Sequence, residues 1–189
     1  MPRPWSAHAV YGTTARVLHW TMAVLILVQA TIGIVMTWAP EGSTLAGLST
    51  ALSFYDVHKL LGVALLALVL VRLANRIGQG VPAEDPSIAA WQAETANIVH
   101  TWMYLLLIVV PLLGWIGVSL YPALTAFGIT LPALTAPDQK MSEPVFVAHA
   151  VAAFVLIGLV LVHVGAALFH ALIRQDGVFR RMWPRDEEA

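Results

Sequence analysis

The sequence predicts an all-α fold, an integral membrane bundle of four helices that forms a single domain over residues 1–189. The first reason is composition, since 59% of the residues are hydrophobic and 11% are charged, whereas a soluble domain has about 25% charged residues. The second is that long runs contain no Asp, Glu, Lys or Arg. The third is that no segment alternates like a barrel strand, so membrane spans should be helical. A water-soluble enzyme and a disordered chain are both excluded.

The first two predicted helices cover residues 15–38 and 54–75. The apolar part of the first is too long for the core of a cleaved signal peptide, which has about 7–15 residues, so we expect a retained span. The second has the weaker signal because Lys59 and Arg72 lie near its ends. Long basic side chains can reach the membrane interface from such positions, so a span is still predicted.

The third and fourth predicted helices cover 96–120 and 145–173, within charge-free runs long enough to cross the hydrocarbon core. The remaining segments are expected to be loops, at 39–53 and 121–144 on one side and 78–93 on the other. Within the longest loop, residues 123–137 are apolar but short and broken by proline. We therefore expect them to lie along the outer surface as a cap.

The basic residues predict the orientation of the bundle. With the N-terminus inside, eight arginines fall on the inner side, and they are Arg3, Arg16, Arg72, Arg76, Arg174, Arg180, Arg181 and Arg185. Only Lys59 and Lys140 fall on the outer side. By the positive-inside rule both termini should be cytoplasmic, and the protein should be a multi-pass protein of a bacterial inner membrane.

The chain contains no cysteine and seven histidines. The absence of cysteine excludes disulfides, thiolate catalysis and iron–sulfur clusters. His8 precedes the first span and should be solvated, whereas six histidines fall on the spans, namely His19, His58, His100, His149, His163 and His170. A single membrane histidine can simply bond a carbonyl of a neighbouring helix. Six of these costly residues together indicate a function.

The spacing of four histidines predicts two layers across the membrane. His163 follows His149 by fourteen residues, which is about 21 Å along a helix and nearly the same face. We therefore expect His58 and His149 in an outer layer, and His19 and His163 in an inner layer. Facing imidazoles meet the axial-ligand requirement of a b-type haem, so these four are predicted to ligate two haem irons.

The residue one turn after each histidine supports this division. It is small after the four predicted ligands, being Ala23, Gly62, Ala153 and Ala167. It is Tyr104 after His100 and Arg174 after His170. A flat macrocycle needs clearance beside its ligands, although small residues also allow close helix packing. His100 reaches the inner layer too, so its pairing with His19 in place of His163 stays open.

His100 and His170 are instead expected near the inner interface, where they could hydrogen-bond a quinone and supply protons. Trp20, with Trp102 and Tyr104, could stack against a flat ring. Arg72 and Arg16 are candidates for the inner haem propionates or the quinone, and Lys59 for the outer haem. The alternative for these three basic residues is that they reach the interface as ordinary membrane anchors.

Taken in order, several short pieces of the chain carry a resemblance. They are Arg16-Val17-Leu18-His19-Trp20, His58-Lys59-Leu60-Leu61-Gly62, Val71-Arg72-Leu73, His100 with Tyr104-Leu105-Leu106, Phe127-Gly128-Ile129-Thr130-Leu131-Pro132, the series His149, His163 and His170, and Arg181-Met182-Trp183-Pro184. From about residue 11 to 184 the chain resembles the bacterial cytochrome b561 family of four-helix di-haem membrane proteins, and most of all its superoxide oxidase branch.

The resemblance implies two haems b on His19, His58, His149 and His163, with quinone contacts near His100 and His170. It also implies an oxidoreductase that takes electrons from superoxide at the outer face and passes them to ubiquinone. No separate catalytic acid or base is expected. The expected partners are the lipid bilayer, superoxide and a quinone, and no nucleic acid.

Two other functions stay open. The chain could be a di-haem subunit that relays electrons between a periplasmic dehydrogenase, or another periplasmic redox protein, and the quinone pool. The outer segments favour this, because they carry Lys59 and Lys140 against Glu41, Asp56, Asp138 and Glu143, whereas a superoxide entry should be electropositive. A haem-free proton or metal transporter is less favoured, since the spans lack the carboxylates that such paths use.

Overall fold

The computed structural model describes residues 10–83 and 88–183. The elements run in the order α1 (Thr13–Trp38), α2 (Thr44–Ala51), α3 (Phe54–Gln79), α4 (Ala90–Leu120), β1 (Thr125–Ala126), β2 (Ile129–Thr130) and α5 (Gln139–Phe169), followed by a π-helical turn, η1 (His170–Arg174), and a 3-10 turn, η2 (Phe179–Arg181). His8, Arg3 and Arg185 lie outside the described residues.

Four helices, α1, α3, α4 and α5, are long and apolar enough to cross a membrane. Large apolar side chains are exposed along all four, for example Leu27, Leu70, Leu105 and Leu161. Helices that are apolar all round are typical of membrane spans, because lipid rather than water covers their outer faces. The predicted all-α membrane bundle is confirmed, and the loop after α4 adds a small hairpin of two strands, β1 and β2, each two residues long.

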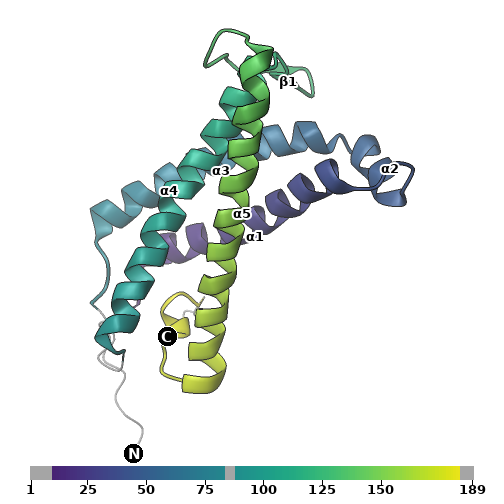
Figure 1. Ribbon diagram of the computed structural model, residues 1–189. Helices are drawn as coiled ribbons and strands as arrows, with labels where there is room; N and C mark the ends of the chain where they lie inside the picture. Colours follow the sequence, from purple (N-terminus) through teal and green to yellow (C-terminus); the bar gives the residue numbers. More distant parts are fainter. Residues whose placement is uncertain (1–9, 84–87, 184–189) are drawn as a thin grey trace, which may run out of the picture.

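The helices are arranged as two hairpin-like pairs that cross each other (Figure 1). In this view α4 and α5 run side by side, while α1 and α3 form the second pair at an angle to them. Close backbone contacts join α4 with α5, α1 with α3, and α3 with α4. Within the described residues, neither α1 nor α3 packs extensively along α5. Contact of α5 with α1 and with α3 therefore depends on side chains.

Two spanning helices begin earlier than hydropathy predicts. α4 begins at Ala90 instead of 96, and the Gln92 side chain accepts a hydrogen bond from the Ala89 backbone at its start. α5 begins at Gln139 instead of 145, capped by Asp138, whose carboxylate accepts from the Lys140 and Met141 amides. Polar capped turns extend each helix beyond the hydrocarbon, where hydropathy gives no signal.

The outer loops are also more ordered than expected. The segment 39–53 contains α2, which Ser43 caps by accepting a hydrogen bond from the Ala46 amide. In the other outer loop, Thr125 pairs with Thr130, and Ala126 with Ile129, around a turn at Phe127 and Gly128. Both of these turn residues have positive φ, 47° and 77°, which tightens the hairpin.

Candidate functional site

The outer histidines, His58 on α3 and His149 on α5, face each other. Their ring centroids are 6.2 Å apart, with the ring planes at 83°. Nδ1 of His149 lies 2.8 Å from the Val110 carbonyl oxygen. Because a carbonyl only accepts, Nδ1 carries the hydrogen, and the lone pair of His149 is on Nε2. Nδ1 of His58 is buried and has no hydrogen-bond partner among the described residues.

Glycines on the two other helices lie directly against these rings. A Cβ built on Gly33 would lie 3.0 Å from Cε1 of His58, and one on Gly114 would lie 3.1 Å from Cε1 of His149. Any larger residue would push an imidazole aside. Neither glycine was predicted from the sequence. Gly62, which was predicted, faces the Gln29 amide, which in turn donates to the His58 carbonyl oxygen at 2.9 Å.

Three histidines meet in the inner layer. The ring centroid of His163 on α5 lies 6.0 Å from that of His19 on α1 and 5.1 Å from that of His100 on α4. With a metal–nitrogen distance of about 2 Å on each side, two imidazoles on one ion have centroids about 6 Å apart. His19 and His163 match that separation and come from helices that do not pack closely. His100 is nearer to His163, and its helix packs directly on α5.

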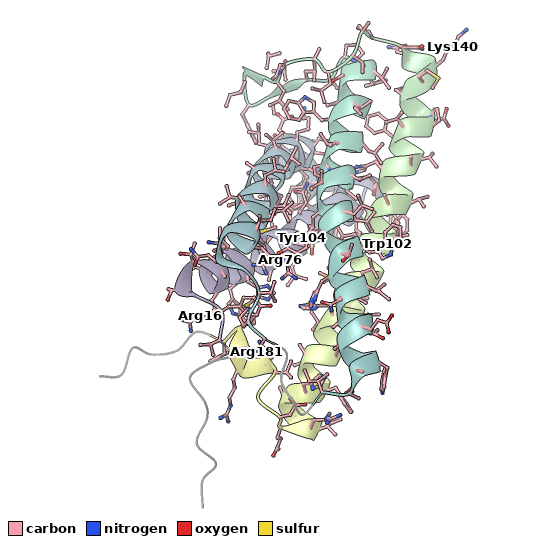
Figure 2. The ribbon with its side chains drawn as sticks, turned by 90° about the vertical axis from the view of Figure 1, so that its left-hand side faces the viewer. Arg16, Arg76, Trp102, Tyr104, Lys140 and Arg181 are labelled. Atoms are coloured by element: carbon pink, nitrogen blue, oxygen red, sulfur yellow. The ribbon has the colours of Figure 1, made fainter. Side chains whose placement is uncertain are left out.

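Arg72 completes the inner layer. Its guanidinium donates to the Tyr104 hydroxyl at 3.1 Å, to the Ala15 carbonyl at 3.2 Å and to Nδ1 of His19 at 3.1 Å. Arg76 lies over the ring of the same tyrosine, 5.8 Å from its centroid. Figure 2 shows Arg76 and Tyr104 close together near the inner half of the bundle. Two cationic groups thus lie beside a membrane-embedded tyrosine and the inner histidines.

Arg16 and Trp20 bind the C-terminal segment. Arg16 donates from one Nη to the Trp183 carbonyl oxygen at 3.2 Å, and its Nε is buried without a partner among the described residues. The Trp20 indole donates to the Met182 carbonyl oxygen at 2.7 Å and packs edge-on against Phe179 and Trp183. It also lies edge-on to His19, at 5.4 Å between centroids. Trp20 therefore lies between His19 of the inner layer and the C-terminal segment.

Lys59 lies next to His58 in sequence, but its ammonium points to the hairpin. It forms an ion pair with Asp56 at 2.9 Å and donates to the carbonyl oxygens of Ala123 and Thr125. Asp56 in turn accepts from the Phe127 amide at 3.1 Å. The Lys59 side chain is 15% exposed, so the structure gives it a role in holding the hairpin. Lys140 lies at the far outer end of the molecule, as Figure 2 shows.

His170 has a partner that was not predicted from the sequence. Its Nδ1 lies 2.5 Å from Oδ2 of Asp176, a carboxylate that is only 7% exposed. Arg174 pairs with the same oxygen at 3.3 Å and reaches the Gln92 amide oxygen on α4 at 3.3 Å. No spacing rule selects Asp176, because it follows the end of the helix and a turn brings it back.

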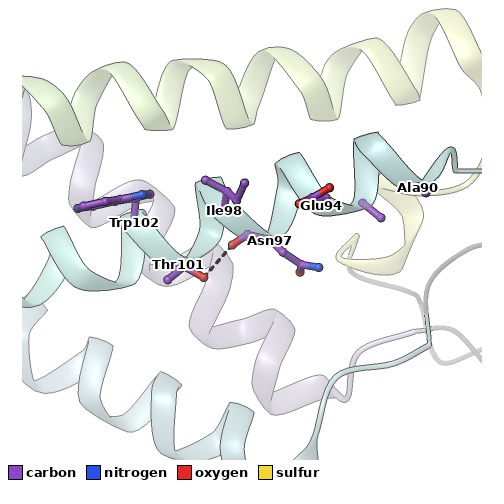
Figure 3. A pocket seen from close by; sticks show the side chains of 7 residues that line it. Ala90, Glu94, Asn97, Ile98, Thr101 and Trp102 are labelled. Atoms are coloured by element: carbon purple, nitrogen blue, oxygen red, sulfur yellow. Dashed lines mark hydrogen bonds between the residues drawn. The ribbon is translucent and has the colours of Figure 1, made fainter.

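A shallow surface depression lies on α4 (Figure 3). Its lining comes from this helix alone, and includes Glu94, Asn97, Thr101 and Trp102. By helical spacing this face is opposite to the one that carries Gly117, which lies against Phe146 of α5. Trp102, one of the expected stacking residues, lines this depression and is 53% exposed.

Comparison with known proteins gives a family for this chain. The family model described as prokaryotic cytochrome b561 matches residues 10–185. Cytochrome b561 homolog 1 of Escherichia coli is 27% identical over 93% of this chain and 97% of its own length. Cytochrome b562 of Cereibacter sphaeroides is 29% identical over 87% of this chain and 89% of its own length. A probable superoxide oxidase CybB of Yersinia pestis is 23% identical over 94% and 98%.

The match to the family model covers the four helices and every histidine from His19 to His170. It agrees with the four apolar helices of the structure and with a multi-pass protein of the bacterial inner membrane. The chain belongs to the prokaryotic cytochrome b561 family, whose members are membrane proteins that bind b-type haem and transfer electrons.

Proposed function

We propose that this protein holds two haems b, one between His58 and His149 and the other between His19 and His163. The observation that carries the proposal is the separation of the ring centroids in the two pairs, 6.2 Å and 6.0 Å. Both separations suit two imidazoles on one iron. Each haem would supply reversible one-electron exchange. The protein would supply the axial ligands, the spacing between layers and the charges around them.

The hydrogen bond made by Nδ1 of His149 supports the outer assignment, and the one made by Nδ1 of His19 would have to change when the inner haem binds. On the outer side, the Val110 carbonyl fixes the tautomer of His149 that leaves Nε2 free for iron. On the inner side, Arg72 only donates, so Nδ1 of His19 accepts from it. Ligation through Nε2 needs the opposite tautomer, so Arg72 must then bind another acceptor. A propionate is such an acceptor, and Arg72, with Arg16, stays our candidate for the inner haem.

We further propose that electrons enter from superoxide at the periplasmic face and leave to ubiquinone near the cytoplasmic face, with His100 and His170 as quinone contacts. The similarity to the Yersinia pestis protein supports the donor. The inner polar groups support the acceptor site, since a quinone needs hydrogen-bond donors for its two oxygens. Two superoxide ions and two protons would convert one quinone to one quinol and release two O₂.

A second function is favoured by the charge of the outer face. Lys59 is already neutralised by Asp56, while Glu41 and Glu143 are exposed on that face. An acidic surface suits a basic periplasmic redox protein better than an anion such as superoxide. In that case the chain would be the di-haem relay between such a protein and the quinone pool.

The test is rapid mixing of the purified holoprotein with superoxide, followed by haem absorbance, with and without a ubiquinone analogue. We expect reduction faster than spontaneous dismutation, followed by quinol formation. No reduction by superoxide would favour the relay, and no Soret band after growth with ample haem would overturn the haem assignment. His58→Ala and His149→Ala should each lose one haem, whereas His100→Ala should keep both.

A further inference from the structure

The pair formed by His170 and Asp176 lies below the inner histidine layer and is not used by haem binding. We propose that Asp176 is a positioning residue that holds His170 as the proton donor to the quinone. This inference rests on the proposed function, because it assigns the source of the protons that quinone reduction consumes. Three observations support it: the contacts of the Asp176 carboxylate, the backbone conformation after α5, and the absence of a hydrogen bond on Nε2 of His170.

Both oxygens of the Asp176 carboxylate are occupied. Oδ2 lies 2.5 Å from Nδ1 of His170 and 3.3 Å from Nε of Arg174, and Oδ1 accepts from the Val178 amide at 3.2 Å. The side chain of Asp176 is 7% exposed and that of His170 is 12% exposed. A carboxylate held at three points in so little water fixes the imidazole in one orientation.

The backbone is shaped to make this contact. α5 ends in the π-helical turn His170–Arg174, a feature often found at functional sites. Gln175 then adopts a positive φ of 51°, which is uncommon outside glycine, and Gly177 has a φ of 87°. These two residues reverse the chain, so that Asp176 returns to the histidine six positions before it.

The contact determines which nitrogen can act. Because the carboxylate accepts, Nδ1 of His170 carries a hydrogen, and Nε2 is the nitrogen that can exchange a proton with a ligand. Nε2 has no hydrogen bond to any described residue. It is also not fully buried, because it is absent from the buried polar atoms that lack a partner. His170 follows His163 by seven residues, so it lies on the same helix face, about 10 Å closer to the inner side.

Quinone reduction sets the number of protons that His170 must deliver. A quinone takes two electrons, supplied by the proposed function, and two protons to become quinol. His170 as imidazolium gives its Nε2 proton to a quinone oxygen, keeps the Nδ1 hydrogen bonded to Asp176, and is reprotonated from cytoplasmic water, twice per quinol. Among residues 10–83 and 88–183, the charged groups of this cluster are Asp176, which contacts His170, and Arg174, which pairs with Asp176.

The experiment isolates the quinone half of the reaction. Pre-reduced holoprotein is mixed with ubiquinone-1, and haem reoxidation is followed in H₂O and D₂O. In Asp176→Asn we expect the maximal rate to fall by at least about tenfold, in line with the loss of general acid catalysis. The KM for ubiquinone-1 should be unchanged and the solvent isotope effect larger. His170→Gln should behave alike, and added imidazole, a diffusible acid, should restore part of its rate.

Glu94→Gln is the matched control, because Glu94 is an exposed carboxylate near the start of α4, and it should match wild type. An unchanged rate in both variants overturns the proposal. A fall accompanied by haem loss and slower haem reduction by the donor also overturns it, because Asp176 would then only shape the end of α5. If reduced wild-type protein is not reoxidised by ubiquinone-1, the proposed function itself fails, whatever the variants do.

Discussion

At the scale of single residues, one spacing organises the interior of the bundle. Each spanning helix carries, fourteen residues apart on one face, two residues that belong to the two layers. They are His19 and Gly33 on α1, His58 and Arg72 on α3, His100 and Gly114 on α4, and His149 and His163 on α5. The outer layer thus combines two histidines with two glycines, and the inner layer combines three histidines with one arginine.

The glycines of the outer layer allow a sharp prediction. In Gly33→Val the new side chain would collide with His58, since even a Cβ would lie 3.0 Å from Cε1. Overpacking of this kind displaces the side chain it meets. We expect the purified variant to lose one of its two haems, measured as the haem-to-protein ratio by the pyridine haemochrome.

Gly158→Val on α5 is the control for Gly33→Val, because nothing lies within 4 Å of a Cβ at Gly158. This variant should retain the full haem content. A Gly33→Val protein that also kept both haems would show that His58 can bind iron from a position other than the one it has beside Gly33.

At the scale of elements, local polar contacts decide what hydropathy leaves open. Asp138 and Gln92 extend α5 and α4 past the hydrocarbon. Asp56 and Lys59, in the first turns of α3, hold the hairpin β1–β2 through its backbone. The hairpin is thereby attached beside His58, at the outer end of the bundle. Lys59 was expected to serve the outer haem, but its ammonium has three protein acceptors already.

The role of Lys59 can be measured directly. In Lys59→Met the hairpin loses two hydrogen bonds from the ammonium, and Asp56 loses its ion pair. We expect faster hydrogen exchange at the amides of Phe127 and Leu131, which bond Asp56 and Leu124, with haem content unchanged. Lys140→Met, at an exposed site, should leave this exchange at the wild-type rate. Loss of a haem with unchanged hydrogen exchange in the hairpin would instead show that Lys59 contributes to binding the outer haem.

At the scale of the whole molecule, the C-terminal segment joins the two helix pairs at the inner end. Through Trp20 and Arg16 it binds the start of α1, and Arg181 donates to the Ala83 carbonyl oxygen of the α3–α4 connection at 2.7 Å. Figure 2 shows Arg16 and Arg181 together at this end, opposite Lys140. Arg16 and Arg181 thus hold the C-terminal segment in place, besides belonging to the basic residues from which the orientation is predicted.

The orientation itself is testable because the chain has no cysteine. A single cysteine at Glu41→Cys should react with an impermeant maleimide added to spheroplasts, since the 39–53 segment is expected outside. One at Gln79→Cys, at the end of α3, should react only after the membrane is opened. The reverse pattern would invert the topology, and with it the sides assigned to the electron donor and the quinone.

The sequence by itself determined the four spanning helices and the position of six histidines along them, since hydropathy and the helical rise are local properties. His19, His58, His149 and His163 were placed at two depths from spacing alone, and their rings do lie near each other in two groups. Gly33 and Gly114 also follow a histidine by fourteen residues, His19 and His100. Their role could not be predicted from this spacing, because it depends on the His58 and His149 rings that pack against them.

Only the tertiary structure decided which groups meet across helices. The nearness of His163 to both His19 and His100, the contact of Lys59 with the hairpin, and the return of Asp176 to His170 depend on helix crossing and turn conformation. Those properties arise from contacts between residues far apart in sequence or from individual φ values. Periodicity fixes the height and face of a residue on its own helix, but packing decides which residue stands opposite.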